Sequence, residues 1–182
     1  MTGFQGSGFF DNPATDPRLQ TPNASGEKAV LTDYLEFYRR TFEMKCDGLT
    51  PEQLATRSVP PSTLSLLGLL RHLGRVEHAW FRRVLDAHLE VDKLYHHTDG
   101  DVAFDAAEGT EECVAQAWST WRREVDFARA WLNDCDDLDR VVTWGEESAE
   151  VRDLVVHMIE EYARHCGHAD LLRECIDGRT GQ

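Results

Sequence analysis

The sequence lacks the features that mark secreted, membrane-spanning and nucleic-acid-binding proteins. It contains no C-x-x-C pair, and an odd number of cysteines, five in 182 residues, favours reduced thiols in the cytoplasm over a disulfide framework. No apolar run approaches the roughly 20 residues that cross a bilayer, and the N-terminus lacks the basic and apolar regions of a signal peptide. Basic residues are also few. A count of 19 against 33 acidic residues gives a net charge of −14, which disfavours binding to nucleic acid or to an anionic membrane.

What remains is a chain of globular composition, with 41% hydrophobic and 29% charged residues and the length of one domain. Residues 1–26 mix Gly, Pro, Ser, Asn and Asp irregularly, so we expect an N-terminal arm that is extended or disordered. From residue 27 to residue 182, apolar residues recur at three- and four-residue spacing, which indicates helices. We therefore predict a single helical domain over 27–182.

Four long helices are expected in that domain, separated by residues that favour caps and turns. The first starts at Glu27 and ends before Asp47-Gly48, and Thr50-Pro51-Glu52-Gln53 then predicts a short capped turn. The second follows a cap at Ser62 or Thr63, the third follows Thr110, and the fourth runs from a cap at Ser148 to Gly178. Such apolar stripes are buried most simply in an all-α four-helix bundle.

Two segments have no helical period. Residues 90–109 form a long crossover loop, with room for a short strand, and loops of this length often cover a site. Residues 141–144 are expected to form one further short strand.

The chemistry of the sequence is concentrated on the last predicted helix. His157, Glu161, His165 and His168 follow one another at spacings of four, four and three residues, which places them on one helix face. Groups four residues apart can hold one ion together, and a facing helix supplies a third ligand, for which His72 is the natural choice. Taken singly, each histidine is explained more simply as a hydrogen-bonded core residue, and a helical glutamate as a surface residue. The combination favours a metal site, because a lone carboxylate near the apolar stripe is costly to bury.

Several segments resemble a known family. SLLGLLRHLGRVEHAWFRRVL (65–85) and VVHMIEEYARHCGHADLLRECIDGRTGQ (155–182), with KCDGLTPEQL and PPSTLSLLGLL, resemble the actinobacterial mini-circle branch of the DinB-like superfamily of metal-binding four-helix bundles. The resemblance implies one divalent metal ion bound by His72, Glu161 and His165, a ligand set similar to that of mycothiol-dependent maleylpyruvate isomerase. It also makes a homodimer plausible. Zinc is the expected metal, although imidazole and carboxylate ligands also suit nickel, manganese and iron.

The neighbouring residues leave alternatives open. His168 stands where many relatives have glutamine, so it can orient a ligand, take up a proton or replace Glu161 as ligand. Glu77 is expected to form a buried ion pair with Arg164 or Arg173, with a catalytic role as the alternative. His157 is expected outside the first coordination shell, and Cys166 is expected to pack away from the ion, because adjacent helical residues point about 100° apart.

A second group of histidines is expected near the surface. His78 is predicted to be exposed, and the loop histidines His88, His96 and His97 can reach the open side of the site.

Three functions are compatible with these residues. The first is an enzyme that activates a low-molecular-weight thiol, with mycothiol favoured by the resemblance, for transfer to an electrophile or for thiol-assisted isomerisation. The second is a stress-related protein that binds a metal or small ligand without turnover. The third is a metal-dependent hydrolase with Glu77 or His168 as base. Dependence of activity on thiol separates the first function from the third.

Overall fold

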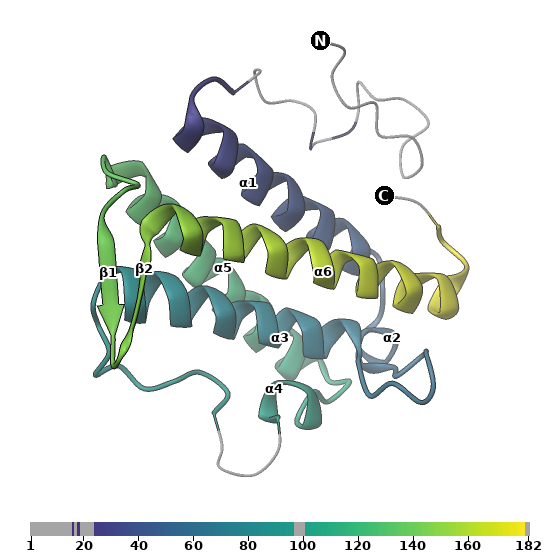
Figure 1. The fold of residues 1–182 in the computed structure, drawn as a ribbon. Helices are drawn as coiled ribbons and strands as arrows, with labels where there is room; N and C mark the ends of the chain where they lie inside the picture. The colour runs from purple at the N-terminus through teal and green to yellow at the C-terminus, as the bar shows by residue number, and fades with distance from the viewer. Residues whose placement is uncertain (1–15, 17, 19–23, 97–100, 181–182) are drawn as a thin grey trace.

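The computed structural model describes residues 24–96 and 101–180, together with Asp16 and Arg18. The expected all-α bundle is confirmed (Figure 1). Its long segments are α1 (Glu27–Cys46), α3 (Leu66–Glu77) with the π-helical continuation η3 (His78–Leu85), α5 (Glu111–Asp134) and α6 (Val151–Asp177). Helix α6 packs against α1 and α3, and α3 also packs against α5. The predicted N-terminal arm lies mostly outside the described residues.

Most of the predicted helix ends are found. Thr50 forms the expected capping box with Gln53 at the start of α2 (Pro51–Ala55), and the Thr110 side chain accepts a hydrogen bond from the Cys113 amide at the start of α5. Gly178 ends α6 in the left-handed conformation, with φ of 78°. None of the helices in the described part of the chain has both the length and the apolar character needed to cross a membrane.

Two helix starts were predicted wrongly. Helix α3 is capped by Ser65, whose hydroxyl accepts from the Gly68 amide, and not by Ser62 or Thr63. Ser148 does not cap α6 but lies in a strand, and α6 follows Glu150 without a side-chain cap. Before α3, Ser62, Thr63 and Ser65 all offer a hydroxyl as a cap, and before α6 the pairing of Ser148 with β1 takes its backbone into a strand.

The short elements also differ in part from expectation. The predicted strand at 141–144 is present as β1 (Val141–Trp144), and it pairs with an unexpected antiparallel strand, β2 (Glu147–Glu150). The crossover loop contains the short helix α4 (Val102–Asp105) where a short strand was allowed for. The hairpin and the start of the crossover loop both lie at the end of η3 (Figure 1).

The core between α1, α3, α5 and α6 is apolar, but it also contains one polar network. Arg39 donates to both carboxylate oxygens of Glu77 at 2.8 and 2.7 Å. The Tyr162 hydroxyl donates to Glu77 Oε1 at 2.7 Å and accepts from Trp121 Nε1 at 2.8 Å. The side chains of this network are almost completely buried, so the ion pair is acceptable only because its polar atoms have partners. The network joins the four long helices, because each of them contributes one of its side chains.

The crossover loop is held against α3 by packing and by hydrogen bonds. Phe104 of α4 lies over Gly68, where an added Cβ would come within 2.5 Å of Phe104 Cδ1. Arg71 donates to the carbonyl oxygens of Ala103 and Val102 at 2.9 and 3.0 Å. These contacts hold α4 beside the face of α3 that carries His72.

Candidate metal centre

Helices α3 and α6 bring together a potential ligand set of two histidines and one glutamate. His72 Nε2 and His165 Nε2 each lie 3.4 Å from Glu161 Oε2, and one donor atom from each residue lies within 4.8 Å of the others. The i, i+4 spacing on α6 supplies Glu161 and His165, and the α3–α6 contact supplies His72. The side chains are 12–23% exposed, so the cluster is partly buried but reachable from solvent.

The charge of the cluster suits a cation. Hydrogen bonds with His165 and His72 hold the pKa of the Glu161 carboxyl well below its usual range, against the opposing effect of burial. The carboxylate is therefore ionised throughout the physiological pH range. Two imidazoles and one carboxylate form a common donor set for a catalytic zinc ion, which keeps a further position for water or substrate. The described residues add no fourth donor to this cluster.

His168 contacts His165 on the side away from Glu161. The two Nδ1 atoms are 3.2 Å apart, which leaves His165 Nε2 directed at the carboxylate. Partial burial and the positive charges of His165 and Arg164 lower the pKa of His168, so its neutral ring is favoured. A neutral His168 can accept the Nδ1–H of His165, and that bond selects the tautomer in which His165 Nε2 is a ligand.

Arg75 contacts His72 in a different way. Its Nη2 lies 2.9 Å from His72 Nδ1, and its guanidinium also pairs with Asp101, with the Nη1–Oδ1 distance at 2.9 Å. Because arginine only donates, His72 Nδ1 must be the acceptor and His72 Nε2 then carries the proton that faces Glu161. Ligation through Nε2 by a neutral ring requires the proton to be on Nδ1 instead, so Arg75 Nη2 must move away from His72 when an ion binds.

The other helix-face residues lie around this cluster. His157 Nε2 is 4.0 Å from Glu161 Oε1, and its ring packs on Trp80 with centroids 5.0 Å apart. Cys166 is buried, donates to the Tyr38 carbonyl oxygen at 3.6 Å, and has its pKa raised to about 12 by burial. Cys166 therefore packs in the core, as predicted, and His157 lies beside the three proposed ligands.

Glu77 and His78 differ from expectation. Glu77 is buried as predicted, but its partner is Arg39, whereas Arg164 pairs with Glu160 and Arg173 with Asp177. The spacing along α3 indicated burial, but the partner depends on the approach of α1, which the sequence does not reveal.

His78 was expected to be exposed but is buried. Its Nδ1 lies 3.3 Å from Glu124 Oε2, and its Nε2 lies 3.0 Å from the Asp92 carbonyl oxygen. Two features account for this burial: the π-helical turn, which the sequence did not predict, and the predicted crossover loop, whose contact with His78 was not foreseen.

A cavity of about 320 Å³ adjoins the cluster on the side of His72. Its walls are Val76, Trp80 and Arg83 from α3 and η3, Lys93 and His96 from the crossover loop, and Trp144 from β1, among others. Of the other loop histidines, His88 is half exposed and pairs with Asp86 and Glu90, and His97 lies outside the described residues. Sequence analysis missed Arg75 and Trp80. The i, i+3 spacing of Arg75 from His72 was the available signal for the arginine.

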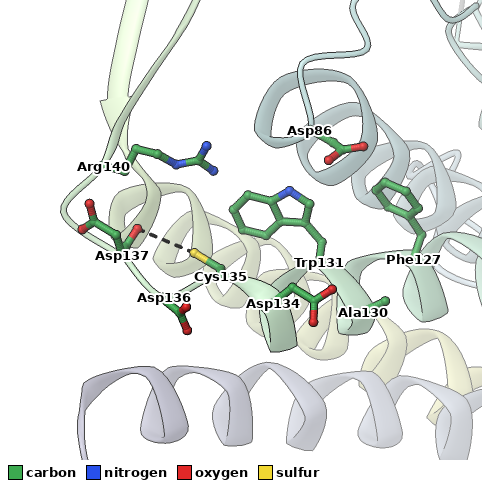
Figure 2. Close-up of a pocket in the computed structure, with 9 residues that line it drawn as sticks. All are labelled: Asp86, Phe127, Ala130, Trp131, Asp134, Cys135, Asp136, Asp137 and Arg140. Carbon is green, nitrogen blue, oxygen red and sulfur yellow. Dashed lines mark hydrogen bonds between the residues drawn. The ribbon is translucent and has the colours of Figure 1, made fainter.

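A second hollow, of about 520 Å³, contains none of the predicted site residues. Figure 2 shows Trp131 and Phe127 on its inner side, with Asp134, Asp136 and Asp137 near the end of α5 and Arg140 opposite. The Cys135 thiol contacts the Asp137 carbonyl oxygen at 3.6 Å. The sulfur is thus part of the loop structure beyond α5.

Comparisons with known proteins agree with this architecture. A family model described as mycothiol-S-transferase matches residues 30–178. A solved structure, the conserved protein of a locus from Enterococcus faecalis, superposes with a TM-score of 0.62 at 16% sequence identity, over 85% of this chain and 99% of that chain. At that identity the likeness shows the fold alone. The search of curated proteins found no match. The family model covers most of the chain and confirms the DinB-like resemblance, so the chain belongs to the mycothiol S-transferase family.

Proposed function

We propose that this protein is a metal-dependent transferase that joins the sulfur of a low-molecular-weight thiol, mycothiol, to an electrophile. The observation that carries the proposal is the convergence of His72, Glu161 and His165 donor atoms within 4.8 Å of one another. The family match supports the thiol, because the matched model is described as a mycothiol-S-transferase. The five free cysteines fit a reducing cytoplasm, in which a small thiol is available.

The donor set suits zinc first, with nickel, manganese or iron as the other metals compatible with imidazole and carboxylate. A divalent ion held there would supply a Lewis acid that lowers the pKa of an incoming thiol. Glu161 contributes a full negative charge, since its carboxyl is ionised at neutral pH. His165 is held in the ligand tautomer by its contact with His168.

The reaction forms a carbon–sulfur bond and releases one proton from the thiol. With an alkyl halide as electrophile, the halide leaves with the electron pair of its former bond to carbon. We assign the thiol proton to solvent water, because the ionised Glu161 is too weak a base and the one acceptor nitrogen of a neutral His168 ring, Nδ1, faces His165 Nδ1. His168 then has the role of orienting His165. We assign Glu77 a structural role, because Arg39 and Tyr162 occupy its buried carboxylate.

The test is conjugation of mycothiol to monobromobimane by the zinc-loaded protein, followed by fluorescence. The wild-type rate should exceed the uncatalysed rate by at least about 100-fold, and His165→Ala should return it to the uncatalysed value. His88→Ala is the matched control, because His88 is exposed and outside the cluster. Equal rates for wild type and His165→Ala would overturn the proposal.

The same experiment separates the other two functions. Hydrolysis of model esters without added thiol would indicate the hydrolase and contradict the transferase. Tight zinc binding with no turnover of any electrophile would indicate a non-catalytic binding protein.

A further inference from the structure

The cavity beside His72 is cationic in a strongly acidic protein. The chain carries 33 acidic and 19 basic residues, yet no acidic residue among those described lines this cavity. Its walls include Arg75, Arg83, Lys93, His78 and His96. A cavity lined by cations in an otherwise acidic protein favours the binding of a negatively charged ligand.

Two of these cations remain available to a ligand. Arg75 is neutralised by Asp101 and cannot offer its full charge. Arg83, by contrast, donates Nε to the Val91 carbonyl oxygen and Nη2 to that of Leu89, so its partners are uncharged and Nη1 remains for a ligand. Lys93 is exposed, and its ammonium group forms no ion pair with a carboxylate in the described part of the chain.

Two tryptophan side chains also line this cavity. Trp80 and Trp144 pack edge to face with ring centroids 5.5 Å apart, and Trp80 is fixed further by His157. Flat indole rings bind planar unsaturated groups well and lose little conformational entropy on binding. The volume, about 320 Å³, is that of a small-molecule site and too small for a peptide.

We propose that this cavity binds the electrophilic co-substrate, and that this co-substrate is a small, flat organic acid whose carboxylate lies between Arg83 and Lys93. The assignment of the ligand as co-substrate rests on the proposed transferase function. His72 is common to the cavity wall and the ligand cluster, so a molecule held there lies next to the thiol site.

A carboxylate is favoured over a phosphate by the position of the cavity on the helix. Arg83 and Val84 belong to the last turn of η3, where the backbone carbonyl groups leave a partial negative charge. That end of a helix disfavours a doubly charged anion, and phosphate sites in proteins usually use a helix N-terminus instead.

Binding of trans-cinnamate, measured by calorimetry on the zinc-loaded protein without thiol, tests the proposal. Cinnamamide serves as the uncharged isostere and phenyl phosphate as the phosphate probe. We expect cinnamate to bind at least tenfold more tightly than either. Lys93→Gln and Arg83→Gln should each weaken its binding fivefold or more, and Arg57→Gln, which removes an exposed charge outside the cavity, should change it less than twofold. Lys93→Gln is the decisive variant, because Arg83 also holds the loop carbonyls.

Equal binding of cinnamate and cinnamamide would overturn the proposal, as would tighter binding of phenyl phosphate or unchanged affinity in Lys93→Gln. These outcomes are independent of catalysis. Turnover of monobromobimane, which is uncharged, tests the transferase function alone, so either idea can fail while the other stands.

Discussion

The Tyr162 hydroxyl donates a hydrogen bond to Glu77 Oε1 across 2.7 Å, one residue from Glu161 on α6 and five residues from His72 on α3. This bond links the two helices that carry the proposed metal ligands. Burial raises the pKa of Tyr162 well above its usual value, so the hydroxyl keeps its proton. The register of α3 against α6 is therefore set by a polar contact inside an apolar core.

Removal of that contact should affect the free energy of unfolding more than the rate of turnover. Tyr162→Phe removes one of the two hydrogen bonds to Glu77 Oε1, which keeps Arg39 Nε, and leaves the buried Trp121 N–H without a partner, at a cost of about 1–3 kcal/mol in the free energy of unfolding. Glu77→Gln leaves Arg39 opposite a neutral amide and should cost about 3–5 kcal/mol. Urea denaturation measures both values, with exposed Tyr34→Phe as control. A Glu77→Gln variant with native stability and a large loss of turnover would instead indicate a catalytic carboxylate.

Loss of a proposed ligand should be distinguishable from loss of a neighbour. His72→Ala and His165→Ala should each weaken zinc binding by more than about 100-fold. Residues that contact a metal ligand without binding the metal typically change the affinity by about 10–100-fold. His157→Ala should therefore weaken zinc binding by about tenfold or less. Competition with a chromophoric chelator provides the measurement. The ligand assignment would be contradicted by a His157→Ala defect as large as that of His165→Ala.

His168 should be replaceable by glutamine but not by alanine. The carbonyl oxygen of a glutamine can accept the Nδ1–H of His165, as the neutral His168 ring does in the structure. We expect His168→Ala to weaken zinc affinity about tenfold or more and His168→Gln to restore most of it. The transferase rate of His168→Gln should follow its zinc affinity, because the bond that orients His165 is retained. A low rate at full zinc occupancy would contradict a purely orienting role and indicate that His168 takes up the thiol proton.

A pH dependence of stability is expected from Glu124, which is not one of the proposed metal ligands. Burial opposes its ionisation, but hydrogen bonds from His78, Arg82 and Arg123 lower its pKa to about 2. A depressed carboxyl pKa contributes stability above its unfolded value, about 4.3, and loses it as the pH falls toward the folded value.

Glu124→Gln should therefore destabilise the protein by about 2 kcal/mol at pH 7, allowing for partial solvent screening. The difference from wild type should shrink below a pH of about 4. Urea denaturation across this pH range measures it, with exposed Glu112→Gln as control. A constant difference down to about pH 2 would refute the assigned cause.

The helical period predicted the helices and the grouping of the candidate ligands on one helix face, whereas the choice of Glu161 over His168 as a ligand came from the family resemblance. Spacing alone placed Glu161 and His165 on one face, and the apolar stripe containing Leu69 and Leu73 placed His72 toward it. Contacts between distant elements were not predictable in this way. The Arg39–Glu77 pair depends on the approach of α1 to α3, and the burial of His78 depends on a π-helical turn and a loop that no period encodes.

The contact between Gly68 and Phe104 constrains how the sequence can vary in related proteins. A side chain at position 68 would overlap the ring that α4 places there, and that ring lies 5.6 Å from the ring of His72. Positions 68 and 104 must therefore covary. Where a relative has a residue larger than glycine at position 68, it must have a side chain smaller than phenylalanine at position 104. A family alignment would thus record the docking of the crossover loop as a correlated pair, next to a histidine that belongs to the candidate metal site.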